Sequence, residues 1–234
     1  MKLQLLPIVF SFFIFTVYSQ IPRSISEPTQ YVNKFESNGY QGSVYNSVGF
    51  TESSITDENA GVYTGQVRYN IDADIIESKI GDELYKLKRD PKLYVRIKDE
   101  NFYYCEFKTE RMLLRKGYYV LVDLNDRYSI YKKYFLEIKD PEKSGGTTGS
   151  PTPGHIKVET AYFLEEGGII KELPKDKKSA LIAFKDKEDE LKAYIKAEKI
   201  KLRKEEDLVR LVSRYNKLKS NNRGRSRSLL VNTY

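Results

Sequence analysis

Oxygen-bearing side chains occupy alternate positions in one short segment, and they are the first candidates for chemistry. Asn70, Asp72 and Asp74 alternate with apolar residues within GQVRYNIDADII, residues 65–76. Such a row either presents ligands to a metal ion or forms the solvated face of a β-strand whose other face is buried. The two interpretations predict different structures for the same residues.

The metal interpretation fails on the spacing of its ligands. A calcium loop that began at Asn70 would need Gly at its sixth position and an acid at its twelfth, but Ile75 and Gly81 stand there. On a strand, alternate residues lie about 6.6 Å apart, so one ion would rarely contact more than two of them. We therefore favour a solvated strand face and expect no metal site.

The residue types that most often carry catalysis are scarce in this sequence. His155 is the only histidine and Cys105 the only cysteine, so a zinc site built from these two types would have one of each. The sequence contains no G-x-S-x-G motif and no glycine-rich phosphate-binding motif. Cys105 lies in the aromatic segment NFYYCEF and is expected to be a buried, inert thiol. We predict no catalytic residue, no cofactor and no enzyme activity.

The chain begins with the features of a secretory signal peptide. Lys2 precedes an apolar run from Leu3 to Val17, and Ser19 is small enough to precede a cleavage site, so residues 1–19 are expected to be removed. The alternative is an uncleaved membrane anchor, but the run is shorter than the ~20 residues that span a bilayer. No later segment is apolar enough to cross a membrane. We expect an exported protein, in the periplasm or outside the cell.

The positive charge is concentrated near the C-terminus. Lys185 to Arg227 contains 15 Lys and Arg residues and 8 Asp and Glu residues, an excess that equals the whole chain's net charge of +7. The segment RGRSRS, Arg223–Ser228, could contact nucleic acid through phosphate groups. In an exported protein we instead favour a solvated tail or contact with an anionic envelope surface. We expect a disordered basic tail over residues 220–234 and no nucleic-acid partner.

Alternation of apolar and polar residues predicts β-strands through most of the chain after residue 64. We expect KLYVRIK to pair with FYYCEFK, GYYVLVDL with RYSIYKKYFLEI, and HIKVETAYFLEE with IIKEL, because short connections favour antiparallel hairpins. Residues 20–64 are rich in Ser, Asn, Gly and Thr and are expected to form an irregular N-terminal arm with one short strand near SVYNSVGF. The Gly- and Pro-rich segment 144–154 predicts an exposed loop, with a domain boundary as the alternative.

The hydrophobic period changes from two to 3.6 residues after Pro174. Short helices are expected around Leu181 and Leu191, followed by a longer helix that begins with acids near Glu205 and ends with lysines. We predict an α+β fold: a curved antiparallel β-sheet (a meander) packed against C-terminal helices, in one domain over residues 65–219. The predicted core residues are Val67, Tyr69, Ile71, Val95, Ile97, Leu208, Leu211, Val212 and Tyr215.

Several segments together resemble a family of exported proteins of unknown function from Bacteroidota-type bacteria. These segments are GSVYNSVGF, VRYNIDADIIE and the stretch from KKSALIAF to SRYNKL. In that family an early strand carries RYNI-x-x-D and a final helix carries YN, which here match residues 68–71, Asp74, Tyr215 and Asn216. The resemblance covers roughly residues 42–218 and implies an exported, β-rich protein. It implies no activity and no binding residues.

These observations lead to two hypotheses for function. The first is a non-enzymatic exported protein that binds a partner protein or a lipid-like, apolar ligand at the cell envelope, because a curved sheet with one helix-covered face can leave a cleft. The alternative is a hydrolase that acts on envelope polymers through Asp72, Asp74 and Glu77, which we call the candidate acids. A pocket lined by apolar side chains would favour the first hypothesis, and converging acids would favour the second.

Overall fold

The computed structural model describes residues 24–28, 35, 39–125, 127–142 and 152–220. The expected signal peptide, most of the Gly- and Pro-rich loop and nearly all of the basic tail lie outside the described residues. Within the described ranges, no helix has both the length and the apolar character needed to cross a membrane.

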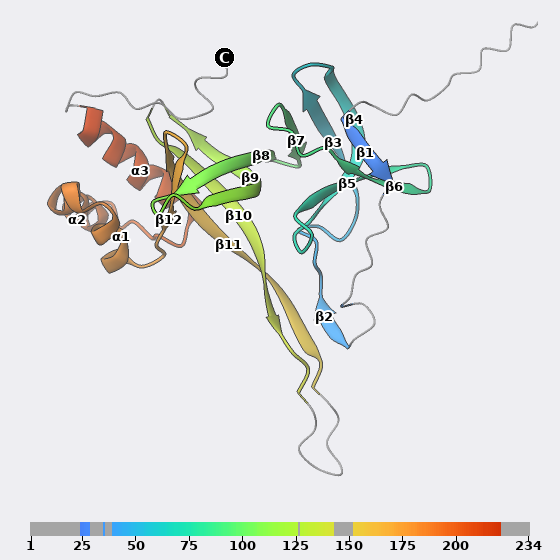
Figure 1. Ribbon diagram of the computed structural model, residues 1–234. Helices are drawn as coiled ribbons and strands as arrows, with labels where there is room; N and C mark the ends of the chain where they lie inside the picture. The colour runs from blue at the N-terminus through green and yellow to red at the C-terminus, as the bar shows by residue number, and fades with distance from the viewer. Residues whose placement is uncertain (1–23, 29–34, 36–38, 126, 143–151, 221–234) are drawn as a thin grey trace, which may run out of the picture.

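The described chain folds into a large β-sheet followed by helices (Figure 1). The strands are β1 (Ile25–Pro28), β2 (Tyr40–Gly42), β3 (Thr51–Asp57), β4 (Gly61–Asn70), β5 (Ile75–Ile80), β6 (Glu83–Leu87), β7 (Leu93–Ile97), β8 (Glu100–Thr109), β9 (Leu114–Leu124), β10 (Ser129–Lys139), β11 (Gly154–Glu166) and β12 (Ile169–Leu173). The helices are α1 (Lys177–Ala183), a 3-10 turn η1 (Lys185–Lys187), α2 (Glu188–Ala197) and α3 (Glu205–Ser220). The predicted α+β class is confirmed.

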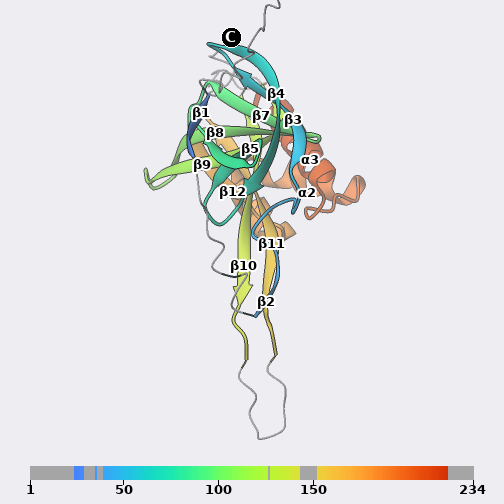
Figure 2. The ribbon, with the colours of Figure 1, turned by 90° about the vertical axis from the view of Figure 1, so that its right-hand side faces the viewer.

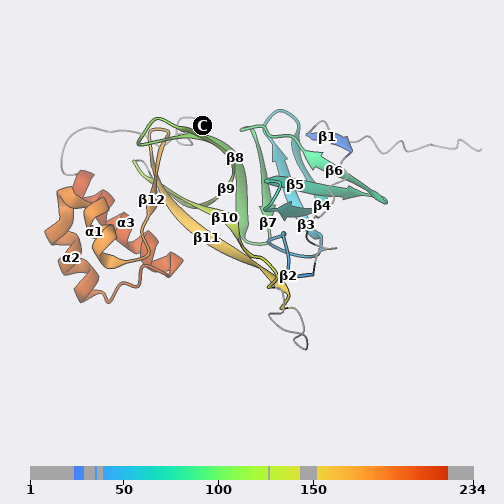
Figure 3. The same cartoon turned by 60° about the horizontal axis from the view of Figure 1, so that its bottom comes forward.

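The sheet divides into an open part and a closed ring. Its order is β1-β6-β5-β4-β3-β7-β8-β12-β11-β10-β9, and a further pairing joins β9 to β8. Strands β8 to β12 therefore close on themselves, as Figure 3 shows, and we call them the ring. Five successive antiparallel strands put the first and last in the same direction, so β12 meets β8 in parallel. The open part, β1 and β3 to β7, extends from β8.

The predicted hairpins are confirmed in their pairing. β7 pairs with β8, β9 with β10, and β11 with β12, all antiparallel. Gly167 and Gly168 make the last of these turns with φ values of 59° and 85°, a conformation that two-residue hairpin turns require and that Gly adopts without strain. β10 and β11 continue together beyond the ring as a two-stranded arm, with β2 in parallel beside β11 (Figure 2).

Among the described residues, four apolar clusters fill the spaces between these layers, and one of them consists of Phe35, Val44, Tyr45 and Ile156. The other three are larger or more central to the sheet. The first lies between the open part and the outer face of β8 and β9, and it includes Tyr69, Phe102 and Tyr118. A second cluster fills the ring with Phe107, Tyr119, Tyr131 and Ile170. In the third, α1, α2 and α3 cover the outer face of β10, β11 and β12. All nine predicted core residues are buried: Val67, Tyr69, Ile71, Val95, Ile97, Leu208, Leu211, Val212 and Tyr215.

Two expectations about strand positions were wrong. The alternation through residues 65–76 does not mark one strand, because β4 ends at Asn70, a turn follows and β5 begins at Ile75. The N-terminal arm expected over 20–64 is not wholly irregular, since it contributes β1, β2, β3 and the start of β4. These strands are polar because much of each faces solvent, which removes the apolar signal that sequence patterns provide.

Candidate functional site

Glu77, one of the candidate acids, is a buried structural group. Its carboxylate accepts hydrogen bonds from Arg68 Nε at 2.7 Å and from Asn70 Nδ2 at 3.1 Å. Asn70 is also buried, and its Oδ1 accepts from the Ala73 backbone N–H at 3.0 Å. A buried carboxylate requires such partners, because burial without them is strongly unfavourable. Glu77 and Asn70 therefore hold the β4–β5 turn and do not face a substrate.

Aromatic rings from the segment before β3 complete this network. The Arg68 guanidinium donates to the Tyr45 hydroxyl at 2.9 Å, and its carbon lies 3.8 Å from the centre of the Tyr45 ring and 4.4 Å from that of Phe50. A planar guanidinium stacks on rings while it pairs with a carboxylate, which a lysine would do less well. The network thus attaches residues 45–50 to β4 and β5.

Asp74 connects the β4–β5 turn to the wall of the ring. One carboxylate oxygen accepts from the Tyr69 hydroxyl at 2.7 Å and from the Tyr118 backbone N–H at 3.2 Å, and the other lies 3.2 Å from Lys133 Nζ. Burial, together with the Asp74 charge, raises the pKa of Tyr69 well above its usual value, so this hydroxyl stays a donor. Asp74 has φ of 50°, a left-handed conformation in which Asp is better tolerated than most residues.

Gly117 makes the contact between Asp74 and Lys133 possible. A Cβ at this position would overlap the Asp74 carboxylate and would lie 2.6 Å from Lys133 Nζ. Lys133 belongs to β10 and Asp74 to the open part, so the absent side chain leaves a passage through the wall of the ring.

The candidate acids do not form one site. Asp72 is exposed in the turn, Asp74 forms an ion pair with Lys133 of the ring, and Glu77 is buried and paired with Arg68. The solvated strand face predicted for Asn70, Asp72 and Asp74 is wrong as well, because Asn70 is buried at the end of β4 and the two acids lie in the turn that follows. This arrangement gives the hydrolase alternative no convergent acid pair from these residues.

The surroundings of Cys105 and His155 also give no sign of a catalytic or metal-binding role. Cys105 is half-buried in the ring, and burial raises the pKa of its thiol to about 12, so it stays protonated and unreactive at neutral pH. His155 is exposed on β11. Over the described ranges, no three His, Cys, Asp or Glu side chains are grouped so that they could hold a metal ion.

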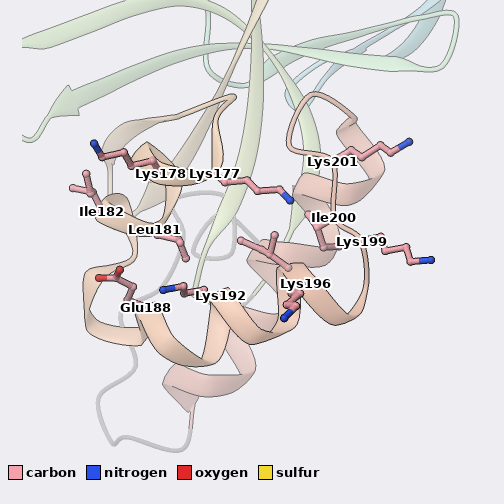
Figure 4. A pocket seen from close by; sticks show the side chains of 11 residues that line it. Lys177, Lys178, Leu181, Ile182, Glu188, Lys192, Lys196, Lys199, Ile200 and Lys201 are labelled. Carbon is pink, nitrogen blue, oxygen red and sulfur yellow. The ribbon is translucent and has the colours of Figure 1, made fainter.

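A large hollow lies among the helices, where Figure 4 shows its lining side chains. It is a groove of about 890 Å³ with α1 on one side, α2 on the other and the turn after α2 at its end, and we call it the helix groove. Leu181, Ile182, Ile195 and Ile200 supply its apolar surface. Such a volume falls within the range of small-ligand pockets.

Lysines surround this apolar surface. Six of the eleven lining residues are lysines and one is an acid, Glu188. In Figure 4 the side chains of Lys178, Lys199 and Lys201 extend outward at the edges while Leu181 points inward. None of the six lysines has an ion-pair partner among the described residues. The six are Lys177, Lys178, Lys192, Lys196, Lys199 and Lys201.

The end of α2 places one of these lysines in an unfavourable backbone conformation. The Ile200 N–H donates to the Ile195 carbonyl at 3.1 Å, the bond of a Schellman C-terminal motif. Lys199 holds the left-handed position of that motif, with φ of 53°, where Gly is usual. This conformation leaves the Lys199 side chain at the edge of the helix groove.

A smaller hollow of about 560 Å³ opens at one mouth of the ring. Tyr119, Phe163 and Ile170 line its inner part, and the turn between β8 and β9 contributes to its rim. Its lining mixes several cations with Glu110 and Glu172, so its charge is less one-sided than that of the helix groove.

Sequence reasoning missed the helix groove for a definable reason. Lys192, Lys196 and Lys199 follow the i, i+4, i+7 spacing of one helix face, and this row was the available signal. These lysines entered the sequence reasoning only as part of the positive charge near the C-terminus. No protein-family model, curated protein or solved structure matches this chain.

Proposed function

We propose that this is a non-enzymatic exported protein that binds an anionic amphiphile in the helix groove at the cell envelope. The observation that carries the proposal is the combination in one hollow of an aliphatic surface with six lysines that lack ion-pair partners within the described chain. Export rests on the signal-peptide features of residues 1–19.

The chemistry of the groove matches both parts of such a ligand. An alkyl chain against Leu181, Ile195 and Ile200 would leave water, which stabilises binding by about 25 cal/mol per Å² of apolar surface. The lysine ammonium groups are mobile point charges that suit a phosphate or carboxylate without demanding one geometry. A ligand with only one of these parts would satisfy only half of the groove.

Charge also favours the approach of such a ligand. Clustered cations of one sign attract an anion over a distance of about 8 Å at physiological ionic strength. Lys187 and Glu190 pair with each other at 3.3 Å just outside the groove, so this pairing does not neutralise the lining lysines. Affinity should therefore fall as salt is added.

The headgroup test replaces Lys192, Lys196 and Lys199 together by Gln and titrates myristoyl lysophosphatidylglycerol below its micelle concentration by calorimetry. We expect at least a tenfold loss of affinity, since each lysine near an anionic lipid contributes about 1 kcal/mol. The matched control replaces three exposed lysines of the open part and its loops, Lys79, Lys86 and Lys92, and should change affinity less than twofold. Equal losses in both triple variants would contradict a specific headgroup site.

The chain test uses Ile182, which lines the groove and is 64% exposed, so its replacement should leave the fold intact. Ile182→Ser should weaken the binding of myristoyl lysophosphatidylglycerol, because the alkyl chain of the lipid loses an apolar contact. Glycerol phosphate has no such chain, so its weak binding should not change. If glycerol phosphate bound as tightly as the lipid, the groove would be an anion site and not an amphiphile site.

A further inference from the structure

The turn between β8 and β9 exposes an apolar tip. Met112, Leu113 and Leu114 are 61%, 57% and 55% exposed, and they form the only run of three exposed large hydrophobic residues in the part of the chain that the structure describes. Other exposed hydrophobic residues, such as Val62, stand singly. Single exposed residues are ordinary on soluble proteins, whereas contiguous ones indicate a contact surface.

The backbone of this turn adds a second, independent observation. The Thr109 N–H donates to the Leu113 carbonyl at 2.9 Å, and the Met112 N–H donates to the Thr109 carbonyl at 2.8 Å. Met112 sits at the left-handed position of this three-residue loop, with φ of 59°. Loops of this type favour Gly there. Met112 therefore carries two costs, a left-handed backbone conformation and an apolar side chain exposed to water. Neither is offset by packing of the Met112 side chain in a core cluster.

Unpaired cations flank the apolar tip. Arg111 and Arg115 are exposed and have no ion-pair partner among the described residues. Two nearby acids are already matched, since Glu106 pairs with Lys116 at 2.7 Å and Glu110 with Lys171 at 3.1 Å. Glu172 lines the same hollow and offsets one of the two arginine charges. The tip thus combines an apolar end with net positive charge around it.

We propose that this turn docks the protein on an anionic phospholipid bilayer. Met112, Leu113 and Leu114 enter the boundary between headgroups and acyl chains, and Arg111 and Arg115 contact lipid phosphates. Apolar insertion combined with basic flanks is how peripheral proteins bind such surfaces. A small protruding turn enters a soft lipid surface, whereas a protein partner would need a matching hollow. The proposal does not depend on the helix groove.

The test exploits the absence of tryptophan from the chain. Leu113→Trp places a single fluorescent reporter at the tip. With vesicles of equimolar phosphatidylglycerol and phosphatidylcholine, we expect a blue shift and quenching by brominated acyl chains, and with phosphatidylcholine alone we expect neither. Because the reporter senses only its own position, insertion of another segment does not produce the signal. Val62→Trp, at a position 67% exposed on β4, is the control and should show no shift.

A second variant separates docking from folding. Met112→Gly relieves the left-handed conformation, so the melting temperature should rise or stay level while vesicle affinity falls severalfold. Replacing Arg111 and Arg115 together by Gln should lower affinity for the anionic vesicles at least tenfold. The Lys192, Lys196 and Lys199 triple variant should keep the tip signal, which distinguishes docking from the groove.

Three outcomes would overturn the proposal. The first is a Leu113→Trp emission spectrum that does not change when anionic vesicles are added. The second is a blue shift of equal size for Val62→Trp, and the third is a Met112→Gly variant that binds vesicles as tightly as wild type does. If Leu113→Trp failed to fold, vesicle co-sedimentation of Met112→Gly would decide the question alone. Capture of a protein at the tip without any vesicle binding would replace the bilayer by a protein partner.

Discussion

Gly117 lets a lysine inside the ring reach an aspartate outside it. A side chain there would displace Lys133 from Asp74, and φ of 153° adds a backbone preference for Gly. We expect Gly117→Ala to lower the free energy of unfolding by about 2–4 kcal/mol, measured by urea denaturation. Gly49→Ala, where nothing lies within 4 Å of the added Cβ, should stay within about 0.5 kcal/mol of wild type.

The same residues show what could be predicted at this scale. The period-two pattern identified Val67 and Tyr69 as buried, because both belong to β4. It misplaced Asp74, because apolar and polar residues keep alternating through the turn although the backbone no longer does. A left-handed φ at an Asp, and a contact with Lys133, which is 59 positions away, leave no periodic signal in a single sequence.

Among the elements, α3 depends on one buried lysine of β10. Lys132 contacts Glu100 and lies 2.8 Å from Glu205 at the start of α3, with only 10% of its side chain exposed. Burial alone would lower the pKa of Lys132, but hydrogen bonds to Glu100 and Glu205 outweigh burial and raise it. The ammonium therefore remains charged and holds two carboxylates that would otherwise repel each other.

Removing that charge should loosen the helix from the sheet. We expect Lys132→Met to destabilise the protein by about 2–3 kcal/mol, because Glu100 and Glu205 lose their shared partner in a partly dry site. The control is Lys219→Met, which breaks the more exposed pair with Asp186 and should cost about 0.5 kcal/mol or less. Urea denaturation followed by circular dichroism measures both, and equal losses would contradict the role of Lys132.

Elements joined by short turns were predictable, and those joined across long stretches of sequence were not. The three hairpins follow from alternation and turn residues, and the helices follow from their period. Closure of the ring depends on only two residue pairs between β12 and β8, Ile169 with Lys108 and Ile170 with Thr109. Such a brief contact between distant segments has no signature in composition or spacing. The lysines of the helix groove were visible, but only the fold shows that they surround an apolar surface.

For the whole molecule, buried Cys and Tyr side chains, which lose a proton only at high pH, predict that alkali destabilises the fold. Burial raises the pKa of Cys105, Tyr119 and Tyr162 to about 12 each. Their folded pKa values exceed the ordinary values of 9.0 for Cys and 10.0 for Tyr, so their stabilising contribution is complete below pH 9 and is lost as pH rises toward 12. The titration of these groups should therefore leave the urea midpoint of the protein unchanged up to pH 9 and lower it at higher pH. A midpoint that held steady up to pH 11 would contradict this linkage.

Strand β8 belongs to both parts of the sheet, since it pairs with β7 on the open side and with β9 and β12 in the ring. Its two faces also serve different interiors, with Phe102 in the cluster toward β3 and β4 and Phe107 inside the ring. Unfolding of either the open part or the ring would remove β8 from the other part, so we expect the two to unfold together. Heating should thus produce a single cooperative transition in a calorimeter, and a ligand held by the helices should raise the melting point of the distant N-terminal strands as well.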